Sequence, residues 1–193
     1  MTNHAVFFDR DGTLNYDTGY LADPDKLVLY PEVGQGISKL KNKFGFKVIV
    51  ISNQSGVARK LMNAKNVDAV NQRLNELLSE YETTIDAFYY CPFHPDFSSQ
   101  EESECRKPSP KMVFDAAASF NIDLKRSYFV GDKSIDIECG INAGLKTGLM
   151  DYNNTNKEIN ILENLKKTPK FVADNFMKMC NFIINDFSGG NNC

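Results

Sequence analysis

The chain has 193 residues, of which 42% are hydrophobic and 24% are charged, and its net charge is −3. This size and composition predict one globular domain, and the small negative charge argues against a broad nucleic-acid-binding surface. No apolar run approaches the roughly 18 residues of a membrane span, and the N-terminus lacks the pattern of a signal peptide. Five cysteines are too few and too odd in number for a disulfide framework, which favours a reducing cytoplasm.

The first predicted strand, residues 5–8, leads directly into two aspartates, Asp9 and Asp11, and a turn at Gly12 and Thr13. A short apolar run that ends in a turn is typical of a buried strand in a parallel sheet. Ligands bind at the carboxyl ends of such strands, and alternate residues of an extended chain point the same way. Both carboxylates are therefore expected to face one pocket, although Asp-Gly alone is equally consistent with an ordinary turn.

Further along the chain, strand-like apolar runs alternate with segments of helical periodicity. Strands are expected at residues 27–30, 46–51, 85–90, 128–130, 145–149 and 171–172. Helices are expected at residues 31–45, 67–81, 109–120 and 134–143, and from residue 175 onward. This alternation predicts an α/β fold, a parallel sheet with helices on both faces. We expect one domain over residues 1–187 and a flexible C-terminal tail over residues 188–193.

Polar side chains follow the strong strands or lie in the loops beyond them. They are Asp9 and Asp11, Ser52 and Asn53, Arg106 and Lys107, and Asp132 with Asp136 one helical turn later. Carboxylates hold Mg²⁺, and an aspartate can attack phosphorus to form an aspartyl phosphate. The rest of phosphoryl transfer is positioning and charge neutralisation, which a hydroxyl and a lysine can supply. Singly, Ser52 is consistent with a turn residue and Lys107 with a solvated lysine, but together the four elements predict a phosphoryl-transfer site.

These motifs resemble those of the haloacid dehalogenase (HAD)-like phosphatases over roughly residues 4–150. The segments that carry the resemblance are DRDGTLN at 9–15, DTGYL at 17–21, SNQSGVAR at 52–59, CRKP at 105–108 and GDKSID at 131–136. Within the superfamily they look most like the D-glycero-D-manno-heptose 1,7-bisphosphate phosphatases and the related histidinol-phosphate phosphatases. The resemblance implies a Rossmann-like parallel sheet without a separate cap domain.

The resemblance also implies roles for individual residues. Asp9 is the expected nucleophile, and Asp11 is expected to protonate the leaving alkoxide and then activate the hydrolytic water. Ser52 and Lys107 are expected to hold the phosphoryl oxygens. The expected magnesium site comprises Asp9, Asp132 and the backbone carbonyl of Asp11, with Asp136 supporting the metal from outside its ligand set. The expected substrate contacts are Asp17, Thr18, Gly19, Tyr20, Asn53, Gln54, Ser55, Arg106 and Lys133.

The implied reaction is Mg²⁺-dependent removal of the 7-phosphate from heptose 1,7-bisphosphate, a small sugar phosphate, by a cytoplasmic monomer with no nucleic-acid or membrane partner. Histidinol phosphate or another small sugar phosphate is the alternative substrate. A phosphate-binding module without catalysis is the alternative from another class, but all the acids that catalysis needs are present. Residues 92–104 are an alternative partner-binding loop, although their Ser/Glu composition is more typical of a solvated loop.

The loop before the Arg-Lys-Pro segment departs from the resembled subgroup, many members of which carry structural zinc there on a Cys-x-His and a Cys-x-Cys pair. Here Phe93 replaces the histidine and Ser103 replaces one cysteine, so Cys91, His94 and Cys105 are the ligands that remain. Structural zinc normally takes four nitrogen or sulfur ligands. We therefore expect a loop without zinc, in which Cys91 and Cys105 are free thiols.

Overall fold

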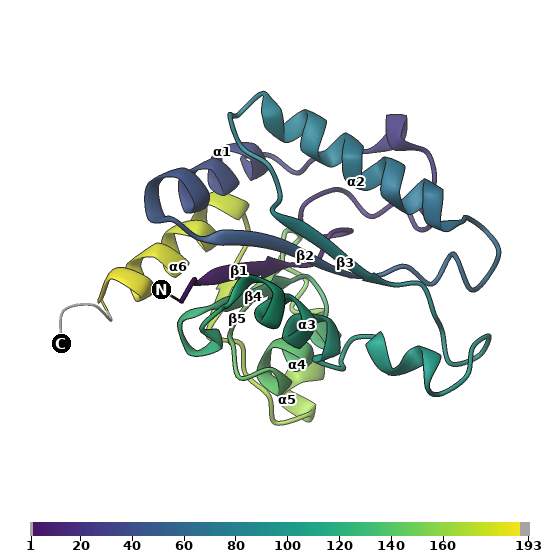
Figure 1. The fold of residues 1–193 in the computed structure, drawn as a ribbon. Coiled ribbons are helices and arrows are strands. Elements are labelled where there is room, and N and C mark those ends of the chain that lie inside the picture. The colour runs from purple at the N-terminus through teal and green to yellow at the C-terminus, as the bar shows by residue number, and fades with distance from the viewer. Residues whose placement is uncertain (1, 190–193) are drawn as a thin grey trace.

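The computed structural model describes residues 2–189, which form a six-stranded parallel sheet flanked by helices (Figure 1). The strands are β1 (Ala5–Phe8), β2 (Lys47–Asn53), β3 (Ala87–Cys91), β4 (Tyr128–Gly131), β5 (Lys146–Met150) and β6 (Phe171–Ala173). Their order in the sheet is β3-β2-β1-β4-β5-β6. The chain thus builds outward from β1 in one direction and then in the other, which places a topological switch point between β1 and β4.

Helices cover both faces of the sheet, as the sequence predicts. They are α1 (Val33–Ser38), α2 (Ala64–Ser79), α3 (Lys111–Phe120), α4 (Ser134–Asn142), α5 (Lys157–Asn164) and α6 (Phe176–Gly189). One core lies under α1, α2 and α6, and the other face packs against α3, α4 and α5 (Figure 1). Strand β1 serves both, because Val6 and Phe8 enter the first core while Ala5 and Phe7 enter the second.

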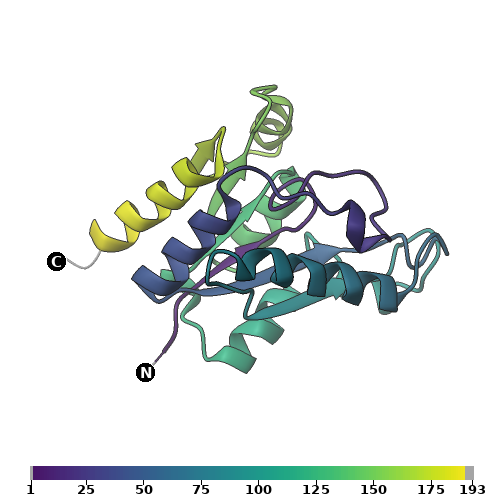
Figure 2. The same ribbon diagram turned by 90° about the horizontal axis from the view of Figure 1, so that it is seen from above.

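Helices α1 and α6 lie side by side on one face of the sheet (Figure 2). Gly36 allows this close approach, since a Cβ there would lie 2.6 Å from Cδ1 of Phe176. The far end of α6 is held by Asp186, which accepts hydrogen bonds from Tyr128 and Lys146 and pairs with Lys170. Burial would raise the pKa of Asp186, but hydrogen bonds from Lys146, Lys170 and Tyr128 lower it to about 2.

Several predicted elements differ in the structure. The strand expected at 27–30 is a single bridge between Leu29 and Asn15, because this segment crosses over the loop after β1 instead of joining the sheet. The helix expected at 31–45 changes to a π-helical turn at Lys39–Lys43. Helix α5 was not predicted, and Leu162 is its one buried residue. Helix α6 extends two residues into the predicted tail, and 190–193 lie outside the described residues. Within residues 2–189, no helix is long and apolar enough to cross a bilayer.

Candidate active site

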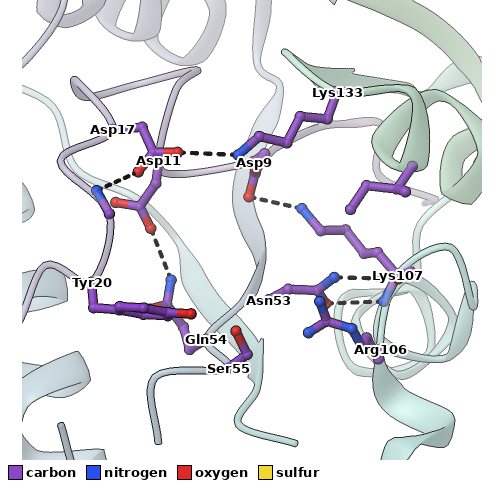
Figure 3. Close-up of a pocket in the computed structure, with 12 residues that line it drawn as sticks. Asp9, Asp11, Asp17, Tyr20, Asn53, Gln54, Ser55, Arg106, Lys107 and Lys133 are labelled. Carbon is purple, nitrogen blue, oxygen red and sulfur yellow. Dashed lines mark hydrogen bonds and ion pairs between the residues drawn. The ribbon is translucent and has the colours of Figure 1, made fainter. Parts of the chain in front are cut away.

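A pocket of about 390 Å³ opens at the carboxyl ends of the strands (Figure 3). Its lining residues are Asp9, Asp11, Asp17, Gly19, Tyr20, Asn53, Gln54, Ser55, Arg106, Lys107, Lys133 and Ile135. The predicted substrate contacts are thus all in its wall except Thr18, which is exposed on the loop after β1. The strand order explains the gathering, since β1, β2 and β4 are neighbours and their polar ends meet at one edge.

Lys107 lies at the centre of the site and is almost completely buried. Its Nζ is 2.7 Å from Oδ1 of Asp9 and 2.7 Å from Oδ1 of Asp136, and it donates a third bond to the backbone carbonyl of Ile51. Burial would lower the pKa of Lys107, but the two carboxylates raise it well above its usual range. The lysine is therefore a fixed positive charge in the floor of the pocket.

Three carboxylates surround this lysine, and they form the acidic group expected of a cation site. Asp9, Asp132 and Asp136 each offer an oxygen, and these oxygens all lie within 4.8 Å of one another. Gly12, at a φ of +89°, makes room for the group, since a Cβ there would lie 2.3 Å from Oδ2 of Asp132. The hydroxyl of Thr13 donates to Oδ1 of Asp132 at 3.0 Å and orients it. Closely spaced hard oxygen donors suit Mg²⁺.

The acidic group is electrostatically unfavourable by itself. Burial raises the pKa of Asp9, Lys107 opposes that shift, and the charges of Asp136 and Asp132 add to it. Burial likewise raises the pKa of Asp132, and Asp136 raises it further. Lys107, together with Lys133 at 4.0 Å from Oδ2 of Asp132, compensates only part of the charge of the three acids, and a divalent cation would favour their ionised forms.

Asp11 points away from this group, and its carboxylate is held by three side chains. Arg10 donates to it from Nε and Nη2, and Asn15 donates to Oδ1 at 3.0 Å. Gln54 donates to Oδ2 at 2.9 Å (Figure 3). Burial alone would raise the pKa of Asp11, but the Arg10 charge and these hydrogen bonds lower it below its usual range. This environment favours the ionised form of the Asp11 carboxylate.

Arg10 was not among the predicted site residues, although it lies between the two motif aspartates. It is fully buried, and its Nη1 donates to Oδ1 of Asn71 on α2 at 2.9 Å. A buried guanidinium anchored on a helix fixes the Asp11 carboxylate in one orientation. The sequence feature that could have identified Arg10 is its position between Asp9 and Asp11, because a side chain there lies next to the site and not on the solvent-exposed surface.

Two predicted substrate contacts use their amide groups to position other site residues. The side chain of Asn53 accepts from the backbone N–H of Lys107 at 3.0 Å and donates to its carbonyl at 3.2 Å. Gln54 donates to Asp11 and, at 3.3 Å, to the hydroxyl of Ser52. These bonds tie the loop after β2 to the Lys107 segment and to the loop after β1, so the three loops form one unit.

The loop at 17–20 is bound to the opposite wall of the pocket. Oδ2 of Asp17 lies 3.1 Å from Nζ of Lys133, which begins the turn into α4. Oδ1 of Asp17 accepts from the backbone N–H of Gly19, which orders the turn that presents Tyr20. Tyr20 is 48% exposed at the pocket mouth, where a substrate can cover it.

Comparison with known proteins identifies the family. The HAD-hydrolase-like family model matches residues 104–179. The D-glycero-D-manno-heptose-1,7-bisphosphate 7-phosphatase of Chlorobaculum tepidum is 40% identical over 179 residues, which are 88% of each chain. The corresponding Escherichia coli K12 phosphatase is 36% identical over 149 residues, 76% of this chain and 78% of that one. The chain belongs to the heptose bisphosphate phosphatase family of HAD-like hydrolases.

A solved structure of this family agrees in fold. The heptose bisphosphate phosphatase of B. bronchiseptica, in complex with magnesium and phosphate, superposes with a TM-score of 0.82 at 26% identity. The match covers 95% of this chain and 99% of that one, so the two proteins share nearly all of their architecture. The predicted parallel α/β fold without a separate cap domain is thereby confirmed.

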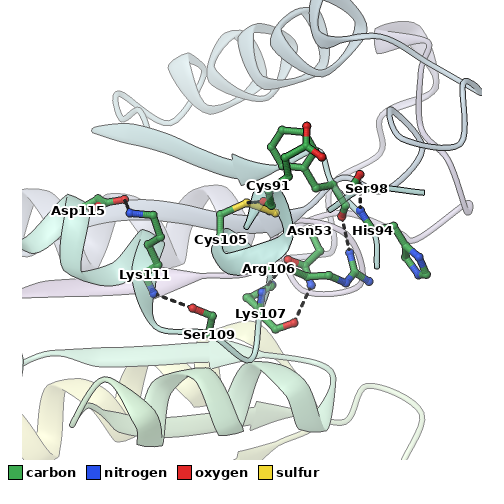
Figure 4. Close-up of a disulfide and its surroundings, with 12 residues drawn as sticks. Asn53, Cys91, His94, Ser98, Cys105, Arg106, Lys107, Ser109, Lys111 and Asp115 are labelled. Atoms are coloured by element: carbon green, nitrogen blue, oxygen red, sulfur yellow. Dashed lines mark hydrogen bonds and ion pairs between the residues drawn. A yellow bond between two sulfur atoms is a disulfide. The ribbon is translucent and has the colours of Figure 1, made fainter. Parts of the chain in front are cut away.

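The prediction of free thiols in the loop after β3 is wrong. Cys91 and Cys105 form a disulfide, with their Cα atoms 5.5 Å apart (Figure 4). The sequence could not show this, because the pairing depends on the helical turn at Glu102–Cys105 returning to the end of β3. The cysteine count therefore does not decide the redox compartment of the protein.

His94, the third ligand considered for zinc in this HAD-like phosphatase, makes other contacts. Its Nε2 lies 3.3 Å from Nη2 of Arg59, and its Nδ1 lies 3.2 Å from the backbone nitrogen of Asp96, from which it accepts a hydrogen bond. Figure 4 shows its ring directed away from the disulfide. The sulfur atoms of Cys91 and Cys105 are bonded to each other and are not thiolates, the form in which cysteine binds zinc.

Proposed function

We propose that this protein is a Mg²⁺-dependent phosphatase that removes the 7-phosphate of D-glycero-D-manno-heptose 1,7-bisphosphate through an aspartyl-phosphate intermediate. The observation that carries the proposal is Lys107, which is buried between Asp9 and Asp136 beside Asp132 at the sheet edge. A fixed cation beside a buried pair of carboxylates is well suited to bind a phosphoryl group. The same arrangement contributes little to fold stability, which supports a functional role. The substrate is the one named for the relatives at 40% and 36% identity.

In this mechanism a carboxylate oxygen of Asp9 attacks phosphorus as the bond to the sugar oxygen breaks. Lys107 holds Oδ1 of Asp9 and, with the hydroxyl of Ser52, binds the phosphoryl oxygens. Asp9, Asp132 and the backbone carbonyl of Asp11 would hold Mg²⁺, which would neutralise the charge of those oxygens, and Asp136 would support the site through Lys107.

Asp11 moves the proton in both half-reactions. It gives a proton to the departing sugar alkoxide and later takes one from the water that hydrolyses the aspartyl phosphate. In the resting protein its lowered pKa favours the ionised carboxylate, which is the form that can take a proton in the second step. The first step needs the anionic phosphate of the bound substrate to raise that pKa, because a like charge nearby favours the protonated form.

The substrate side of the pocket is cationic and polar. Lys133 and Arg106 lie on its walls, with Asp17, Tyr20 and Ser55 (Figure 3). Gly19 also lines the pocket, and Thr18 is exposed beside it on the same loop. A sugar that carries a second phosphate suits this wall, because a guanidinium binds phosphate through two parallel hydrogen bonds. Histidinol phosphate, the alternative substrate, has one phosphate and a cationic amine, which two basic residues would repel.

The test is phosphate release from heptose 1,7-bisphosphate, heptose 7-phosphate and histidinol phosphate in the presence of Mg²⁺. We expect the bisphosphate to have the highest kcat/KM, and Asp9→Asn to retain about a thousandth of the activity or less. Asp115→Asn, an exposed aspartate of α3, is the matched control and should be unchanged. Faster turnover of histidinol phosphate would refute the substrate, and an active Asp9→Asn variant would refute the covalent route.

We further propose that the protein is one domain over residues 1–187, with α6 continuing to Gly189, and that it is a cytoplasmic monomer and holds no zinc. Support for the last point is the loss of two of the four family ligands, at Phe93 and Ser103. Light scattering tests the oligomeric state, cell fractionation tests the location, and elemental analysis tests the metal. About one tightly bound zinc per chain would contradict the last proposal.

A further inference from the structure

A second, smaller cavity lies beside the substrate pocket and has no role in the mechanism above. Its volume is about 130 Å³, and its buried inner end is formed by Gly12 and Asp132. Asp132 belongs to the acidic group expected to hold Mg²⁺, and it opens into this cavity, whereas Asp9 opens into the substrate pocket. Each cavity therefore gives access to a different carboxylate of the same acidic group.

The walls of this second cavity are fixed to the turn after β1. The rings of Tyr30 and Tyr152, which both line it, stack with their centroids 3.8 Å apart. The Tyr152 hydroxyl donates to the backbone carbonyl of Thr13 at 2.8 Å, and the hydroxyl of Thr13 donates to Asp132. A cavity needs only about 15 Å³ to hold one water molecule, so this one has room for a cation with several of its waters. Mg²⁺ gives up its waters reluctantly, so its path to the site must offer such room.

The two cavities differ in charge. Of the described residues, three carboxylates and three basic side chains line the substrate pocket. Within the same described range, the second cavity has three carboxylates, Asp132, Asp151 and Glu158, and one basic side chain, which belongs to the exposed Lys157. Asp151 and Glu158 accept hydrogen bonds from backbone N–H groups, which carry no net charge and do not neutralise them. A cavity lined mainly by one sign of charge concentrates ions of the opposite sign, so the second cavity attracts cations.

We propose that Mg²⁺ enters and leaves the active site through this second cavity, while the phosphorylated substrate enters through the substrate pocket. This inference rests on the proposed function, because it concerns the metal that the reaction uses. Asp151 and Glu158 attract the hydrated cation at the entrance, and Asp132 receives it at the inner end. The cation thereby avoids the basic side chains of the substrate pocket, and a substrate already bound there leaves the path of the metal open.

The test measures the binding kinetics of Mn²⁺, a probe that takes the same oxygen ligands. Electron paramagnetic resonance of free Mn²⁺ gives Kd, and stopped-flow trapping of released Mn²⁺ by a fluorescent chelator gives the dissociation rate constant. The association rate constant is the dissociation rate constant divided by Kd. We expect Lys157→Glu to raise the association rate constant about threefold or more at low ionic strength, with little change in the dissociation rate constant, because a charge at an entrance acts on the approaching ion. At an ionic strength of about 1 M, where the Debye length is about 3 Å, this gain should disappear.

Two variants with the same change of charge are the controls. Lys125→Glu changes an exposed lysine just before β4, at the amino ends of the strands, and should leave the association rate constant within about 1.5-fold of the parent value. Arg106→Glu changes the wall of the substrate pocket and should raise the rate constant less than Lys157→Glu does. A rate constant that does not rise in Lys157→Glu, or an equal gain in either control, would overturn the proposed path. A parent protein that binds no Mn²⁺ would instead refute the metal dependence of the proposed function.

Discussion

Loss of Lys107 should lower both the stability and the activity of the protein, and the variant Lys107→Met tests this. Methionine keeps most of the length of the side chain but removes its charge, so Asp9 and Asp136 lose their shared cation and Lys133 beside Asp132 is the positive charge that remains. At an effective dielectric of about 20, each of the two 2.7 Å ion pairs has a Coulomb energy of about 6 kcal/mol. Most of this offsets the desolvation of three buried groups.

The net cost of removing one partner from a buried ion pair is about 3–5 kcal/mol. We expect the free energy of unfolding of Lys107→Met in EDTA to fall by about this amount. The loss is reduced if Asp9 and Asp132 take up protons, because protonation removes their uncompensated charge. Mg²⁺ should restore part of the loss, since it replaces the missing charge. Activity at saturating Mg²⁺ should fall by about a hundredfold or more, because the transferred phosphoryl group loses a preorganised donor.

Urea denaturation with and without Mg²⁺, together with phosphate release, measures these quantities. Lys111→Met is the matched control, because Lys111 is 53% exposed and its pair with Asp115 spans 3.7 Å. It should lose less than about 0.5 kcal/mol and keep full activity. A Lys107→Met protein that unfolds within about 1 kcal/mol of the parent in EDTA and retains a tenth of its activity would refute this account.

Three further variants test separate parts of the structure. Asp11→Asn should slow formation of the aspartyl phosphate from a sugar phosphate far more than from an activated aryl phosphate, whose leaving group needs no acid, and equal losses in the two single-turnover assays would exclude the acid role. Cys105→Ser removes a disulfide between cysteines 14 residues apart, so the free energy of unfolding measured in urea without reductant should fall by about 3 kcal/mol. Reductant should lower the free energy of unfolding of the parent but not that of the variant. Asp186 has its pKa lowered to about 2 by its tyrosine and two lysines, so its contribution to stability is present above pH 4, roughly the unfolded value, and is lost as pH falls through 2. Asp186→Asn should therefore destabilise the protein at pH 7 and have little effect near pH 2, as measured by urea midpoints.

The amino-acid sequence determined the fold class and the composition of the site. Strand periodicity is a local property, and it located β1 and β2 because buried parallel strands are continuous apolar runs. The acids and lysine of the site could be placed at one edge because polar residues directly after parallel strands must meet there. Helix α5 was missed because it is short, and the apolar stripe of Ile159 and Leu162 spans only one turn.

Only the tertiary structure decided which partners these side chains take. Asn53 holds the backbone of Lys107, 54 residues away, and Arg10 reaches Asn71 across 61 residues. Such pairs depend on strand order and on the register of loops, which no local pattern encodes. The same holds for Cys91 and Cys105, whose chemistry changes from two thiols to one bond because a short helical turn brings them together. The residue types in the sequence thus determine which chemical groups are available, and the tertiary structure determines which of these groups contact each other.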